Sequence, residues 1–229
     1  MRPVHLLLAV AACAAALPRP AAAQETAVDE GTLVISRNGA AIGREAYRIV
    51  AAAAGGGQAY RATATLSFDS ARISLRLTTD SAGAPLSYEA EVRVHGRLAS
   101  RVDGNGRPGL FSTLAKTADG ESARDYVMGP GPLLLDADAF DPYYFALLPP
   151  RRTRVSVIDP RAGTQATLRL EDRGSEPIRV GRGTITARHF ALVGADGASR
   201  DVWVDGQGRL LRVAIPARGL VAQRDEAPR

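Results

Sequence analysis

The stretch ISLRLTTDSAGAPLSYEAEVRVH, residues 73–95, contains two runs in which apolar and polar side chains alternate. Ile73, Leu75 and Leu77 occupy every second position of the first run, and residues 88–94 repeat the pattern in the second. A period of two places apolar side chains on one face of a β-strand and polar side chains on the other. Asp80 to Gly83, between the runs, carries the residues of a hairpin turn. The stretch therefore predicts two antiparallel strands, each with one buried and one solvent-exposed face.

The same alternation recurs along the chain, for example at residues 166–171 and 210–215. Glycine-rich turn signals separate the runs at Asn38-Gly39, Ala54 to Gly57, Asp103 to Gly106, Asp119-Gly120, Asp172 to Gly174, Asp196-Gly197 and Asp205 to Gly208. No long helical pattern connects the runs, so the strands follow one another in hairpin order. We expect an all-β, mainly antiparallel meander of about a dozen strands, which curls into a half-barrel or open barrel, or else splits into a sandwich.

A curled sheet has a concave apolar face that large side chains, a ligand or an inserted segment must fill. The candidate insert is DADAFDPYYFALLPP, residues 136–150. Asp141 before Pro142 predicts an N-cap and first turn, and Pro149-Pro150 stops the helix, so we expect about two helical turns over Pro142 to Leu148. This helix is apolar nearly all round, so we expect the segment Asp136 to Leu148 to be buried as a lid or plug.

The hydrophobic side chains of this insert are the candidate ligand-binding residues. They are Phe140, Tyr143, Tyr144, Phe145, Leu147 and Leu148, to which we add Trp203, the only tryptophan. Trp203 alternates with Val202 and Val204 and therefore lies on the opposite face of its strand from them. It either packs under a loop or lines a binding surface.

The aspartates of the insert do not match a calcium loop. In an EF-hand pattern starting at Asp136, Phe140 stands at an oxygen-ligand position, Asp141 at the glycine position and Leu147 at the glutamate position. We therefore expect Asp136, Asp138 and Asp141 to serve as caps and as solvated loop residues. No metal ligand is assigned.

The sequence contains no motif that we interpret as catalytic or cofactor-binding. Gly104 to Gly109 matches G-x-G-x-x-G, but it lies between β-type runs, so we interpret Asn105-Gly106 as a turn and expect no cofactor. Glu89 and Glu91 share one strand face, where we expect a solvent-facing ladder with arginines. Two histidines follow residue 23: His95 lies near a turn, and His189 is in phase with Ile185 and Ala187, which favours a hydrogen-bonded position over a zinc site.

The N-terminus predicts export. Residues 1–23 have a basic start, an apolar run from Leu6 to Leu17 and Ala21-Ala22-Ala23, as in a secretory signal peptide cleaved after Ala23. The alternatives are an N-terminal anchor helix and lipidation at Cys13, which follows Val10-Ala11-Ala12 as in a lipobox. We expect a periplasmic or extracellular protein with no integral membrane span after cleavage, and without cysteine, because Cys13 is the only one.

The mature chain is expected to contain a flexible leader (24–30), a single β half-barrel domain (31–222) and a flexible tail (223–229). The net charge is +5, and loss of Arg2 and Arg19 lowers it to +3. The arginines are scattered singly rather than gathered beside aromatic residues, so we expect no nucleic-acid partner.

Three segments resemble families of uncharacterised exported bacterial proteins, of the domain-of-unknown-function type. They are residues 38–45 (NGAAIGRE), 181–185 (GRGTI) and 201–213 (DVWVDGQGRLLRV). This resemblance implies a curled antiparallel sheet similar in shape to the lipoprotein-carrier half-barrels of the bacterial envelope. It carries over no catalytic or binding residues.

The sequence favours a non-enzymatic envelope protein that binds a lipid or other hydrophobic molecule in the concave face. One alternative is a structural or interaction module with a filled core, whose protein partner is not specified by the sequence. The other is a hydrolase or metal enzyme built around His189 or the aspartates.

Overall fold

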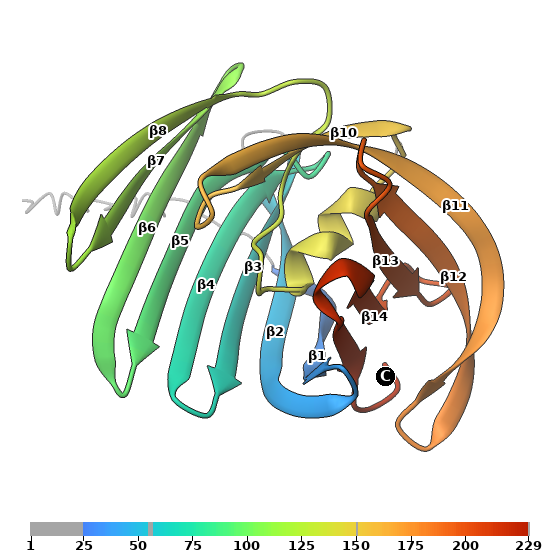
Figure 1. Cartoon of the computed structure of the whole chain (residues 1–229). Coiled ribbons are helices and arrows are strands. Elements are labelled where there is room, and N and C mark those ends of the chain that lie inside the picture. Colours follow the sequence, from blue (N-terminus) through green and yellow to red (C-terminus); the bar gives the residue numbers. More distant parts are fainter. Residues whose placement is uncertain (1–24, 55–56, 150, 229) are drawn as a thin grey trace, which may run out of the picture.

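The protein folds as one curled β-sheet around a short helix. The computed structural model describes residues 25–54, 57–149 and 151–228, and the predicted signal peptide and Cys13 lie outside these ranges. Over them a 15-stranded sheet wraps around the short 3₁₀ helix η1 (Asp141–Leu147), as Figure 1 shows. The predicted all-β, mainly antiparallel half-barrel with one short helix is confirmed.

The described residues form fifteen strands and two short 3₁₀ helices. The strands before η1 are β1 (Thr26–Arg37), β2 (Ala40–Ala54), β3 (Gly57–Phe68), β4 (Ala71–Asp80), β5 (Pro85–Val94), β6 (Arg97–Arg107), β7 (Leu110–Thr117), β8 (Gly120–Val127) and β9 (Pro132–Leu134). Those after it are β10 (Arg154–Asp159), β11 (Thr164–Val180), β12 (Gly183–Val193), β13 (Ser199–Val204), β14 (Leu210–Ile215) and β15 (Leu220–Arg224), with η2 (Pro216–Arg218) before β15.

The first and last strands are neighbours in the middle of the sheet. The spatial order is β8-β7-β6-β5-β4-β3-β2-β1-β15-β14-β13-β12-β11-β10-β9, and all pairs are antiparallel except β9 with β10. The edge strands β8 and β9 do not pair with each other, so the barrel stays open. A side chain connects β11 to the edge strand β8 across the opening: Gln165 Nε2 donates a hydrogen bond to the carbonyl of Val127 at 2.8 Å.

Two predicted turns lie inside strands. Residues 104–107 belong to β6, and the turn falls at Pro108 and Gly109, where Gly109 has φ of +76°. Gly104 lies within β6, and its lack of a side chain makes room for a large neighbour. A Cβ at this position would lie only 2.7 Å from the Phe111 ring. Likewise Asp172 to Gly174 forms a bulge within the long strand β11.

The predicted leader and tail are also corrected, because strands reach into both. β1 begins at Thr26 and β15 ends at Arg224, so the folded unit is longer than residues 31–222. A buried ion pair joins the two extensions: Arg224 Nη1 lies 3.0 Å from Asp29 Oδ1, and both side chains are almost fully covered. Asp29 also accepts hydrogen bonds from Tyr47 and from the Leu210 amide.

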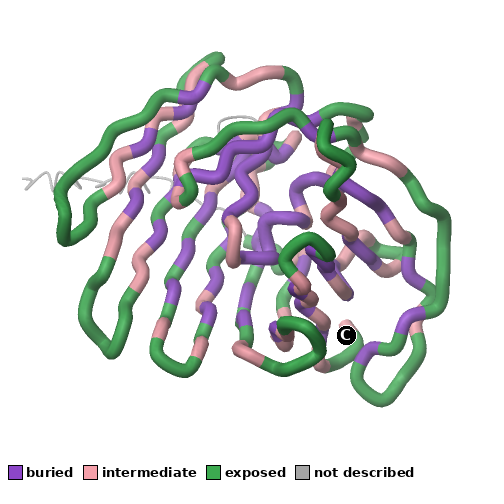
Figure 2. The backbone as a smooth tube through the Cα atoms, in the orientation of Figure 1, coloured by how far each residue is buried: buried purple, intermediate pink, exposed green. Residues whose placement is uncertain are grey.

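The main core lies on the concave face of the sheet. Along β4, Ile73, Leu75 and Leu77 are buried and the residues between them are exposed, as the alternation predicts. One cluster of buried side chains joins the concave face to η1, and Figure 2 shows this buried region inside the curl, with exposed residues on the outer hairpins.

A second, smaller core lies on the convex side of the same sheet. Trp203 packs there with Ile178, Val180, Ala187, Leu211 and Ala214. The far end of the β11–β12 hairpin covers these side chains, since Glu176 accepts the Trp203 indole N–H and the Arg179 carbonyl accepts Gln223 Nε2. Trp203 therefore packs under a hairpin, while Val202 and Val204 point into the main core.

Candidate functional site

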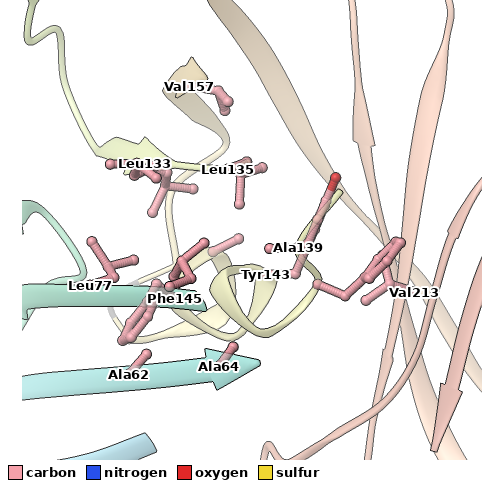
Figure 3. Packing of buried hydrophobic residues seen from close by; sticks show 14 of the residues in the cluster. Ala62, Ala64, Leu77, Leu133, Leu135, Ala139, Tyr143, Phe145, Val157 and Val213 are labelled. Carbon is pink, nitrogen blue, oxygen red and sulfur yellow. The ribbon is translucent and has the colours of Figure 1, made fainter. Parts of the chain in front are cut away.

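The plug segment, residues 136–148, occupies the concave face. Within it η1 contacts β3, β9 and β14 and therefore bridges opposite walls of the curl. Figure 3 shows Phe145 beside Ala62 and Leu77 on one side and Tyr143 towards Val213 on the other. Ala62 and Ala64 are small and buried, which leaves room for the Phe145 ring against β3.

The helix begins differently from the prediction. Phe140 is the N-cap residue and makes no side-chain cap bond, and Asp141 is the first helical residue. The missing cap is supplied by Glu45 of β2, whose carboxylate oxygens accept the Phe140 amide at 2.8 Å and the Asp141 amide at 2.7 Å. A tertiary carboxylate thus satisfies N–H groups that a local cap would otherwise bind.

The prediction that Asp136 and Asp141 are solvated loop residues is wrong, because both are buried. Asp136 accepts the Tyr88 hydroxyl at 2.6 Å and forms a two-point ion pair with Arg161. Burial raises the pKa of Tyr88, and the Asp136 charge adds to this, so the phenol stays a donor. The start of the plug segment is therefore fastened to β5 and to the β10–β11 turn.

Asp138 is half-buried and fastens the plug segment to a third place. Its carboxylate lies 2.9 Å from Arg161 Nη2 and 2.7 Å from Arg218 Nη2 of η2. Burial opposes ionisation of Asp138, but Arg218 and Arg161 outweigh it and lower the pKa of this carboxyl.

Glu45 and Asp141 form a buried pair of acids. Both side chains are 0% exposed, and neither Asp141 oxygen has a donor among the described residues when both acids are ionised. Burial raises the pKa of Glu45 well above its usual value, and the Asp141 charge raises it further. Burial also raises the pKa of Asp141, to about 7, while Glu45 opposes the shift by hydrogen bonding. The pair therefore holds a proton near neutral pH, which Glu45 shares with Asp141.

A pocket of about 430 Å³ opens beside the start of the plug segment; we name it the mouth pocket. Its apolar walls are Ile35, Ile42, Phe68, Ile73, Val92, Phe140 and Leu220, and Arg37, Asp69, Ser70, Asp138 and Arg161 also line it. Its volume falls in the range of small-molecule sites, about 300–1,000 Å³. Phe140 connects the mouth pocket to Glu45, because its side chain lines the pocket and its amide donates a hydrogen bond to the Glu45 carboxylate.

The structure brings six of the seven candidate ligand-binding residues together. Phe140, Tyr143, Phe145 and Leu147 are buried in the plug segment, and Tyr144 and Leu148 are half-buried there. Trp203 is not among them, because it lies in the convex core.

The sequence interpretation missed Glu45, Tyr88 and Arg161. Glu45 carried a signal, since it occupies the inward phase of β2 together with Tyr47 and Ile49. Arg161 lies in a turn, where no periodicity could have pointed to it.

The histidine and the glutamates considered as candidate catalytic groups lie away from the plug segment. His189 is half-buried on the convex side, where it stacks on Trp203 at 4.2 Å and lies 3.0 Å from Asp201. Glu89 and Glu91 form the expected exposed ladder with arginines such as Arg76. Within the described ranges no three His, Cys, Asp or Glu side chains gather as a metal site, and no helix is long and apolar enough to span a membrane.

Comparison with known proteins assigns no function. A family model described as a domain of unknown function (DUF6134) matches residues 136–223, from the plug segment into β15. Among solved structures, a β-barrel-like protein of the domain of unknown function DUF1849 from Brucella abortus is 12% identical, with a TM-score of 0.44, covering 88% of this chain and 94% of that chain. No curated protein matches. The resemblance to domain-of-unknown-function families is confirmed in this coarse form.

Proposed function

We propose that this is an exported, non-enzymatic cell-envelope protein that binds a lipid or another hydrophobic molecule in the concave face. The observation that carries the proposal is the mouth pocket, whose apolar wall is shared between the sheet and Phe140 of the plug segment. A ligand chain in this pocket would extend inward by displacing the start of the plug segment.

The fastening of the plug segment suits a part that moves as a unit. Its apolar residues pack on the sheet, while its polar fastenings are concentrated at Asp136, Asp138 and the first turn of η1. Breaking a few polar contacts would free the start of the segment, and a hydrophobic guest would replace its apolar contacts.

Extraction of the purified protein tests the proposal. Protein prepared without detergent from the envelope fraction is extracted with organic solvent, and mass spectrometry of the extract should show a stoichiometric lipid or other amphiphile. A Val92→Trp variant, which fills the mouth pocket, should release much less. Leu98→Trp, at an exposed position after the β5–β6 turn, is the matched control and should behave like the wild type. An empty wild-type extract would refute the proposal.

A second candidate is a structural or interaction module, because the concave core is already filled by the plug segment. Its partner would meet the exposed edge strand β8, where Tyr126 is the only buried residue. An envelope protein recovered reproducibly with the wild type, and lost when β8 is altered, would favour this module.

A further inference from the structure

Glu45 binds the amide of Phe140, whose side chain lines the mouth pocket. Carboxylates surround the Glu45–Asp141 pair: the Asp141 charge raises the pKa of Glu45, and the Asp136 and Asp29 charges raise the pKa of Asp141. The nearby arginines are already engaged, since Arg161 binds Asp136 and Arg224 binds Asp29. Apart from the proton shared with Asp141, the Glu45 carboxylate is bound by the two amides at the start of the plug segment.

Displacing Phe140 and Asp141 would remove both of these donors. Glu45 would then lose both amides and also Asp141, with which it shares a proton. A carboxylate in apolar surroundings needs a hydrogen-bond donor or a positive charge, because burying it without a partner is unfavourable. Whatever replaces the start of the plug segment must therefore supply one.

We propose that Glu45 selects ligands that carry a protonated amine, so that the guest of the concave face is a cationic amphiphile. This inference rests on the proposed function and names its ligand class. The ammonium group would take the place of the Phe140 and Asp141 amides at Glu45, and the apolar chain would lie along Ile35, Ile42 and Ile73 in the mouth pocket. A protonated amine favours the ionised form of Glu45, so its binding releases the proton that Glu45 shares with Asp141. A carboxylate ligand repels that ionised form, and an alcohol offers a single neutral donor.

The net charge of the chain acts against the expected preference for an amine ligand. With a net charge of +5, or +3 after loss of Arg2 and Arg19, the chain attracts anions at long range and repels cations. A preference for the amine must therefore come from a local carboxylate.

Binding of three amphiphiles with the same chain tests the inference. Decylamine, decanol and decanoate are titrated into the wild type at pH 7 by calorimetry, below their micelle concentrations. A charge-assisted hydrogen bond is worth about 1.5–3 kcal/mol, so decylamine should bind at least about tenfold more tightly than decanoate. In Glu45→Gln this ratio should fall close to one, whereas Glu121→Gln on the exposed strand β8 should leave it unchanged.

A measurement on the wild type covers the case in which Glu45→Gln fails to fold. Decylamine should accelerate hydrogen exchange at the amides of Phe140 and Asp141, and the same concentration of decanoate should accelerate it less. Equal affinities for the three compounds, or tighter binding of decanoate, would overturn the amine preference while leaving the binding function intact. Failure of all three to bind would count against the binding function itself.

Discussion

At the scale of the residue, the polar groups that hold the plug segment are those that the sequence pattern hid. Asp136, Asp138 and Asp141 fit loop solvation because charged residues are seldom buried without a partner. Their partners Tyr88, Arg161, Arg218 and Glu45 come from elements far away in the sequence, and a single sequence does not show which strand faces which loop.

Replacing Asp136 with Asn should destabilise the protein strongly. The change leaves the largely covered Arg161 guanidinium without its buried counter-charge, and breaking a buried pair from one side costs about 3–5 kcal/mol. Urea denaturation measures the loss. Glu89→Gln removes an exposed pair with Arg76 and should change the free energy of unfolding by less than about 1 kcal/mol. Equal effects of the two variants would show that Asp136 is not a fastening point.

The Glu45–Asp141 pair should make the fold less stable as pH rises. The pKa of Asp141 is raised from 3.8 to about 7, so between these values the folded state binds more protons than the unfolded state. The contribution of the pair is then fully present below about pH 4 and is lost as the pH rises towards and beyond 7. Unfolding free energies measured at pH 5 and pH 8 should differ less in Asp141→Asn than in the wild type. If the difference between pH 5 and pH 8 is the same in the variant and the wild type, the raised pKa of Asp141 is refuted.

At the scale of the element, alternation predicted the strands well, and turn residues predicted their ends less well. Gly104 and Gly174 belong to strands because one makes room for Phe111 and the other follows a bulge. A glycine required by packing looks the same in a sequence as a glycine required by a turn.

Gly104 and Gly183 offer a matched pair of substitutions. Gly104→Ala would press a Cβ against the Phe111 ring, and overpacking of this kind costs about 1–3 kcal/mol. At Gly183, also in a strand, the nearest atom to an added Cβ is 3.9 Å away, so Gly183→Ala should be neutral or slightly stabilising. Thermal unfolding of the two variants distinguishes packing from a general effect of strand glycines.

The β11–β12 hairpin should control the emission of the only tryptophan. Glu176→Ala removes the acceptor of the Trp203 indole N–H and loosens the hairpin over the convex core, so the emission should shift to longer wavelength. Binding of a ligand in the concave face should leave the emission unchanged, because Trp203 lies on the other side of the sheet. A shift caused by the ligand alone would place the guest on the convex side.

At the scale of the whole molecule, the sequence predicted a curled antiparallel sheet with an inserted aromatic helix, and both are present. It could not predict that β1 and β15 meet in the middle of the sheet, because that pairing depends on contacts between the two ends of the chain. It also could not locate the mouth pocket, which is assembled from several strands, two plug residues and Arg161 of a turn.

The central claim is that the plug segment yields to a hydrophobic guest. The most direct measurement is hydrogen–deuterium exchange over residues 136–148, with and without a bound amphiphile, using β4 as an internal reference. The account predicts faster exchange at Phe140 and Asp141 on binding and no change along β4. Unchanged or slower exchange at these two amides, with the ligand demonstrably bound, would contradict the account.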